Sequence, residues 1–182
     1  MRTVILDPPS AGLEALMERR RQSGLDRLDE VWEGVYHMVP APSDAHADIG
    51  QQLAELLGPL ARAARLYPTV QEFNLGVSEH DFRVPDGGLH RSRRWGTWEP
   101  TVPLVVEIVS PNDETWDKLP FYAARGVDEV LIVDPQKRSI DWLALTDGEY
   151  RNVERSAVIE LGTAELQAQL DWPEIDEPLS GR

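Results

Sequence analysis

Three residues in the middle of the chain have side chains that together could carry out hydrolytic chemistry. Asp86 follows Pro85, Glu107 stands 21 residues later within an apolar run, and Lys118 follows after a further 11 residues. Two carboxylates on neighbouring strands can bind one Mg²⁺ or Mn²⁺ ion, because these ions prefer oxygen ligands. An ammonium group nearby can orient a water molecule and stabilise the charge that develops on a phosphate under attack. The set is typical of a metal-dependent phosphodiester hydrolase.

Glu107 is the single charged residue in the apolar run from Leu104 to Val109, which ends at Ser110-Pro111. Valine and isoleucine dominate the run, so it predicts a strand. An unpaired buried carboxylate costs several kcal/mol, so an ionised glutamate at such a position usually binds a metal, pairs with a cation or faces solvent. The run alone leaves the solvent-facing alternative open.

These side chains require a sheet to position them. The apolar run at 130–133, ended by Asp134-Pro135, is typical of a strand buried on both faces. With the strand at 102–109 and the helix between them, which Gly126 closes, it predicts a right-handed crossover joining adjacent, parallel, central strands. We expect further strands or hairpin arms at 30–39, 69–73, 81–84, 139–145 and 150–155, helices at 13–21, 44–65 and 163–170, and a long polar loop at 87–100.

Composition narrows the possible functions. The 182 residues suit a single domain, 1–182, and contain no cysteine, which excludes thiolate zinc sites and a cysteine nucleophile and fits a cytoplasmic protein. No stretch resembles a signal peptide or a membrane span. The net charge of −14 opposes nonspecific attraction to nucleic acid. A nucleic-acid function therefore needs a local basic patch or bound cations.

One such patch is the cluster around Arg91, Arg93 and Arg94, which are candidate substrate-binding residues. A solvated surface is the alternative for a short basic run in an acidic protein. His46 lies near the start of the apolar stripe of the helix at 44–65, and we interpret it as a structural histidine.

Four segments of this sequence, in order, are similar to the Uma family of putative restriction endonucleases. They are Arg83-Val84-Pro85-Asp86, Leu104 to Pro111, Lys118 to Val127, and Leu131-Ile132-Val133-Asp134-Pro135. The resemblance implies the PD-(D/E)xK nuclease fold, which is an α/β, restriction-endonuclease-like mixed sheet flanked by helices, here with added N-terminal and C-terminal hairpin strands. It implies a nuclease core at about 31–145, with Asp86 and Glu107 as metal ligands.

Two departures from that family pattern concern the site. The superfamily's usual lysine follows two residues after the glutamate, where this chain has Val109, so the resemblance implies that Lys118 replaces it. A further family carboxylate comes from a Gly-Glu pair, but here the order is Glu33-Gly34 and Val35 stands in its place. Residues two apart share a strand face, so we expect Glu33 to substitute as a catalytic residue.

The leading hypothesis is a Mg²⁺-dependent DNA endonuclease that uses Asp86, Glu107 and Lys118. We expect the Lys118 ammonium to lie near both carboxylates, favour their ionised forms and itself stay protonated. A homodimer would supply two active sites for two DNA strands, with Trp95, Trp98 and Trp142 as candidate interface anchors. The alternative is a non-catalytic binding or interaction protein on a nuclease-like scaffold, which the net charge and the missing strand lysine favour.

Overall fold

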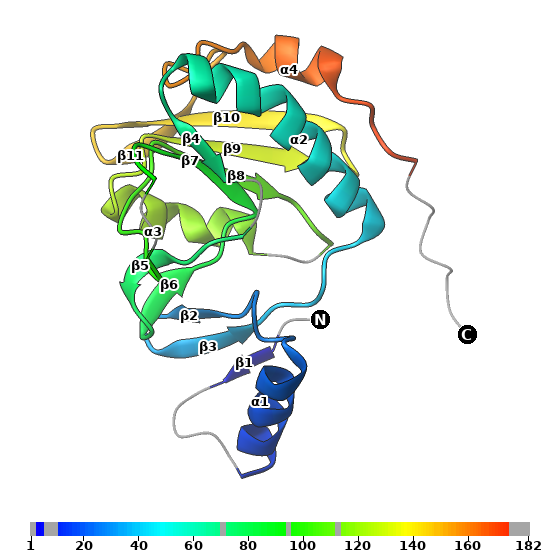
Figure 1. Cartoon of the computed structure of the whole chain (residues 1–182), viewed down its shortest axis with the longest axis vertical. Coiled ribbons are helices and arrows are strands. Elements are labelled where there is room, and N and C mark those ends of the chain that lie inside the picture. Colours follow the sequence, from blue (N-terminus) through cyan, green and yellow to red (C-terminus); the bar gives the residue numbers. More distant parts are fainter. Residues whose placement is uncertain (1–2, 6–10, 70–71, 94–95, 112–113, 175–182) are drawn as a thin grey trace.

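The computed structural model describes residues 3–5, 11–69, 72–93, 96–111 and 114–174. A six-stranded sheet forms the centre of the molecule (Figure 1). In spatial order its strands are β11 (Glu149–Asn152), β10 (Ser139–Thr146), β9 (Glu129–Asp134), β8 (Leu104–Ile108), β7 (Gly87–His90) and β4 (Tyr67–Thr69). The strands β8 and β9 are parallel, and all other neighbours are antiparallel. The predicted pair of adjacent parallel central strands is confirmed.

A second sheet of five strands lies below the first in Figure 1. Its order is β1 (Thr3–Ile5), β3 (Val35–Met38), β2 (Glu30–Trp32), β6 (Asp81–Arg83) and β5 (Leu75–Ser78). The helices are α1 (Ala11–Ser23), α2 (Asp44–Ala63), a 3₁₀ turn η1 (Thr115–Lys118), α3 (Leu119–Ala124) and α4 (Thr163–Gln169). None of these described helices is long and apolar enough to cross a membrane.

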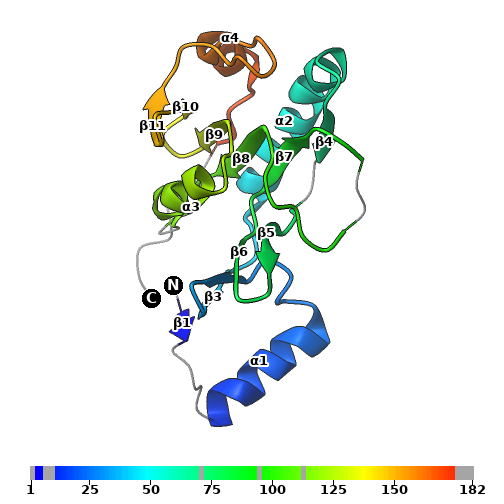
Figure 2. The same cartoon turned by 90° about the vertical axis from the view of Figure 1, so that its left-hand side faces the viewer.

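Helices cover both faces of the larger sheet (Figure 2). On one face α2 and α4 bury apolar side chains against it, and each fully buried leucine or isoleucine contributes about 2 kcal/mol. On the other face α3 contributes Tyr122 to a second core. The predicted mixed sheet flanked by helices is therefore present.

The alternation of side chains along β8 decides the direction of Glu107. Leu104, Val106 and Ile108 belong to the core under α2 and α4, whereas Val105 belongs to the core on the α3 side. Successive side chains of a strand point to opposite faces, so Glu107 shares the α3 face with Val105. Glu107 is the penultimate residue of β8, so it lies near the end of the strand, from which the chain continues to η1 and then α3.

The segment from Gly87 to His90 is the strand β7, so the predicted loop at 87–100 is wrong over these residues. Glycines have low strand propensity, which hid the strand in the sequence. Here a small residue is required, because a Cβ added at Gly88 would lie 2.9 Å from the Leu104 carbonyl oxygen and 3.0 Å from the Phe73 ring. The strand matters for the site because Asp86 directly precedes it.

Trp142 does not offer an interface. It is 1% exposed, and its Nε1 donates a hydrogen bond to Glu129 at 2.8 Å. The reason is that β10 lies inside the sheet and turns this side chain into the core beneath α2 and α4. Trp98 is half-buried against the ring of Phe82, and Trp95 lies outside the described residues.

Candidate active site

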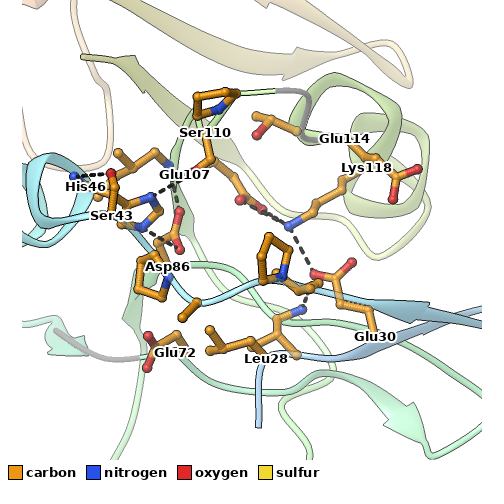
Figure 3. Close-up of a pocket in the computed structure, with 18 of the residues that line it drawn as sticks. Leu28, Glu30, Ser43, His46, Glu72, Asp86, Glu107, Ser110, Glu114 and Lys118 are labelled. Atoms are coloured by element: carbon orange, nitrogen blue, oxygen red, sulfur yellow. Dashed lines mark hydrogen bonds and ion pairs between the residues drawn. The ribbon is translucent and has the colours of Figure 1, made fainter. Parts of the chain in front are cut away.

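One pocket collects side chains from both sheets and from η1. Asp86 lies between β6 and β7, Glu107 lies near the end of β8, and Lys118 ends η1; all three line the pocket. Figure 3 shows Glu107 between Asp86 on one side and Lys118 on the other. The three residues chosen from the sequence therefore meet at one place.

Glu107 and Lys118 form a buried ion pair. Glu107 is 2% exposed, and the Lys118 Nζ donates to both of its carboxylate oxygens at 3.2 Å. The hydroxyl of Tyr122, the buried residue of α3, also donates to Glu107 Oε1. The Glu107 carboxylate is therefore held in one orientation by two donors.

Burial raises the pKa of Glu107 to about 8, because the Lys118 ammonium only partly offsets the desolvation. The charge of Asp86 acts in the same direction as burial. Burial by itself would lower the pKa of Lys118, but the surrounding carboxylates raise it above its ordinary value, so the ammonium stays protonated as expected. The Lys118 ammonium favours the ionised form of Glu107, as expected, but burial outweighs this effect on the pKa.

Asp86 is fixed by one backbone donor and one histidine. Its Oδ2 accepts the N–H of Ile108 at 2.7 Å, and its Oδ1 lies 3.0 Å from Nε2 of His46. His46 Nδ1 in turn lies 3.1 Å from the hydroxyl of Ser110. His46 sits in the first turn of α2, where its own N–H is capped by Ser43. His46 therefore has a positioning contact at the site, which the sequence pattern did not reveal.

Glu30, the first residue of β2, is a site residue that the sequence reasoning missed. Its Oε1 accepts from the Lys118 Nζ at 3.0 Å and from the Val84 N–H at 2.8 Å. Its Oε2 accepts from Trp32 Nε1 at 2.6 Å, and the residue is 2% exposed. Glu30 and Glu107 thus hold the same ammonium from the two sheets.

Glu33 does not take the place expected for it. The segment at 30–39 is a hairpin in which Glu33 and Gly34 form the turn, with φ of +50° and +85°. A two-residue turn with both φ values positive reverses the chain, so the rule that residues two apart share a face does not apply across it. Glu33 is exposed and does not line the pocket. It directly follows the strand β2, which Glu30 begins, so the two residues lie at opposite ends of that strand.

The basic cluster lies at the other end of β7 from Asp86. Arg91 directly follows β7 and pairs with Asp128, and the Arg93 guanidinium lies 5.2 Å from the centre of the Tyr67 ring. Neither arginine lines the pocket, and Arg94 lies outside the described residues. The structure does not bring Arg91 and Arg93 to the carboxylates, and their role in substrate binding stays a prediction.

The donor set suits a divalent cation. Among the described residues no group of three or more His, Asp or Glu side chains is arranged to hold a metal. Two carboxylates suffice for Mg²⁺, which usually keeps several waters. The N–H of Ile108 donates to Asp86 and fixes one of the two candidate ligands. Burial, together with the nearby charges of Asp86 and Glu30, raises the pKa of Glu107, and a bound cation would stabilise its ionised form.

Comparison with known proteins adds independent information. No curated protein matches the chain. The crystal structure of a "putative nuclease belonging to DUF820" from Anabaena variabilis ATCC 29413 is similar, with a TM-score of 0.61 and 15% sequence identity. The match covers 78% of this chain and 90% of that one, and at this identity it shows a common fold.

A family model described as "putative restriction endonuclease", Uma2, matches residues 18–175. This range contains Asp86, Glu107 and Lys118, as well as Glu30 and His46, which contact them. On the sequence match, which spans most of the chain, and the shared fold, this protein belongs to the Uma2 family of putative restriction endonucleases.

Proposed function

We propose that this nuclease-family protein is a DNA endonuclease that depends on Mg²⁺ or Mn²⁺. The observation that carries the proposal is the meeting of Asp86, Glu107 and a half-buried, protonated Lys118 in one open pocket. A purely structural ion pair between Glu107 and Lys118 would not require the Asp86 carboxylate to line the same pocket. The family supports nuclease activity, and the metal dependence and the DNA substrate are our proposal.

Asp86 and Glu107 would hold the metal ion. When bound, such an ion polarises a phosphate oxygen and lowers the pKa of a coordinated water. The chain prepares the two ligands in advance, because Ile108 and His46 hold Asp86, and Tyr122 and Lys118 hold Glu107. Preorganisation of this kind spares the cost of ordering the side chains during the reaction.

Lys118 would stabilise negative charge on the phosphate and would not act as a base. Its raised pKa keeps the ammonium charged throughout the physiological range. The Glu30 carboxylate fixes the position of the ammonium from the second sheet at 3.0 Å. Glu30 is itself saturated by Trp32 and Val84, so we assign it a positioning role.

The experiment that tests the proposal is cleavage of single-stranded and duplex DNA by the purified protein in Mg²⁺, in Mn²⁺ and in EDTA. We expect cleavage only with metal, and loss of cleavage in Asp86→Ala. Metal-independent cleavage would contradict the metal dependence. Protein that binds no metal and cuts neither DNA would support the non-catalytic alternative.

The homodimer stays a prediction that rests on the need of two active sites to cut two strands. Its support from the tryptophans is reduced, because Trp142 is buried and Trp98 packs on Phe82. Light scattering decides the matter, since the mass of a single chain at micromolar concentration would contradict the dimer.

A further inference from the structure

The pocket that holds the carboxylates also has an extended apolar wall. We use the term apolar wall for Leu28 together with the segment Met38–Pro42, which joins β3 to α2, and all of these residues line the pocket. Pro40, Ala41 and Pro42 are exposed, so this surface is open to a ligand. Two prolines restrict the backbone of the segment, so the wall is formed before a ligand arrives.

A phosphodiester group and a metal ion are charged and gain no favourable interaction from an apolar surface. The base of a nucleotide does, because its flat faces stack on apolar and aromatic groups. In a duplex the faces of the bases are covered by stacking, so a pocket can take a phosphate and the face of its base together only when the base is unpaired. The continuity of the apolar wall with Asp86 and Glu107 therefore favours an unpaired nucleotide.

The charges of the pocket also disfavour a duplex. Duplex binding depends on many Lys and Arg contacts to phosphates. Among the described lining residues only Lys118 and His46 can be cationic, and they already contact Glu107 and Asp86 respectively. The net charge of −14 opposes the binding of any DNA, and it opposes a duplex more than a single strand because the duplex has the higher charge density.

A second aromatic surface lies beside the pocket. Trp116 is 48% exposed and stands on η1 between Thr115 and Lys118, both of which line the pocket. Glu114 at the start of this turn contacts His37 Nδ1 at 2.9 Å, which ties the turn to β3. Trp116 is thus held near the pocket without lining it, at a place where the base of a neighbouring nucleotide could stack.

We infer that the substrate of the proposed nuclease is an unpaired DNA strand. The base next to the cleaved phosphodiester lies on the apolar wall, and a neighbouring base stacks on Trp116. This inference rests on the proposed function and specifies its substrate class.

Binding tests the inference separately from cleavage. Fluorescence anisotropy in Ca²⁺ compares a labelled single strand of about 20 nucleotides with a blunt-ended duplex of the same strand and its complement. We expect the single strand to bind at least about ten-fold more tightly, and Trp116→Ala to reduce its affinity by about ten-fold. Trp116→Phe keeps an aromatic face and should retain most of the affinity.

Matched charge variants test the wall itself. Ala41→Glu places a carboxylate on the apolar wall, and Ala47→Glu adds the same charge in α2 at an exposed residue that does not line the pocket. We expect Ala41→Glu to weaken binding of the single strand by about ten-fold and Ala47→Glu to change it by less than about two-fold. Both sites are exposed, so neither change should impair folding.

The inference is overturned if the blunt-ended duplex binds as tightly as the single strand, or if the variants of Ala41 and Ala47 behave alike. Cleavage of duplex in Mg²⁺ together with such results would leave the proposed nuclease function standing. Strand-selective binding that Ala41→Glu weakens, without cleavage of either DNA, would support the assigned ligand and overturn the nuclease assignment.

Discussion

Replacing Lys118 by alanine removes a cation that Glu107 and Glu30 share. Both carboxylates are 2% exposed, and the ammonium lies 3.0 Å from Glu30 and 3.2 Å from Glu107. Loss of one partner of a buried ion pair costs about 3–5 kcal/mol, because the remaining charge stays buried and uncompensated. Protonation of Glu107, whose pKa is already raised to about 8, relieves part of this cost. We therefore expect the metal-free variant to lose about 3 kcal/mol of unfolding free energy at neutral pH.

The same change should separate metal binding from catalysis. Removing a positive charge near the ligands does not weaken cation binding, so the Mn²⁺ affinity should stay the same or rise. The rate of DNA cleavage should fall by about 10²–10³, which is typical of the loss of one electrostatic donor that acts in the transition state. Saturating Mn²⁺ should restore part of the lost stability, since a ligand of the folded state adds about 2.7 kcal/mol at 100 times its Kd.

The assays are urea unfolding with and without Mn²⁺, calorimetric Mn²⁺ titration and single-turnover cleavage. The matched control is Lys137→Ala, which removes a lysine whose side chain is 74% exposed and which pairs with the buried carboxylate of Asp134. Solvent screens the exposed ammonium and the Lys137 backbone N–H still donates to Asp134, so this control should lose about 1 kcal/mol at most and keep its activity. A Lys118→Ala variant that cuts DNA at the wild-type rate would remove Lys118 from the mechanism.

Three further results are expected. Because a cation displaces the proton held by Glu107, Mn²⁺ affinity should rise by about ten-fold per pH unit up to pH 8 and then level off in calorimetric titrations; a flat profile from pH 6 to 9 would argue against the buried ligand. Glu30→Gln should lower the cleavage rate and keep the Mn²⁺ affinity, and exposed Glu33→Gln should match the wild type in the same assays. Loss of cleavage in Glu33→Gln but not in Glu30→Gln would instead support Glu33 as the catalytic carboxylate. Glu129→Ala leaves the buried Trp142 indole without its acceptor, so urea unfolding should show a loss of about 3 kcal/mol, and an unchanged midpoint would refute a structural role.

The sequence was most informative where residues with reactive side chains lie at the ends of predicted strands or at the start of a predicted helix. Asp86 and Glu107 are carboxylates at or near strand ends, and Lys118 opens the helix that follows, so short, regular connections were enough to predict their meeting. The parallel pair β8 and β9 was predictable because both strands are continuously apolar.

The missed features depend on tertiary contacts that no local pattern encodes. Glu30 and Glu33 are equally acidic, and only the turn at Glu33-Gly34 decides that Glu30 is buried and Glu33 exposed. Whether His46 contacts Asp86 depends on how α2 is placed on the sheet, which its apolar stripe does not determine. From the sequence, Tyr122 is indistinguishable from an ordinary core residue. Its role depends on the structure, in which Glu107 lies on the face of the sheet that α3 covers and accepts its hydrogen bond.

The central claim is that Asp86 and Glu107 form a metal site that the reaction requires. Its most direct test is a Mn²⁺ titration of the wild type and of Asp86→Ala, each checked for a folded state by circular dichroism and then assayed for DNA cleavage. We predict that the wild type binds Mn²⁺ and cuts DNA, and that Asp86→Ala loses both properties together. Identical Mn²⁺ binding by the two proteins, or binding by neither, would contradict the claim.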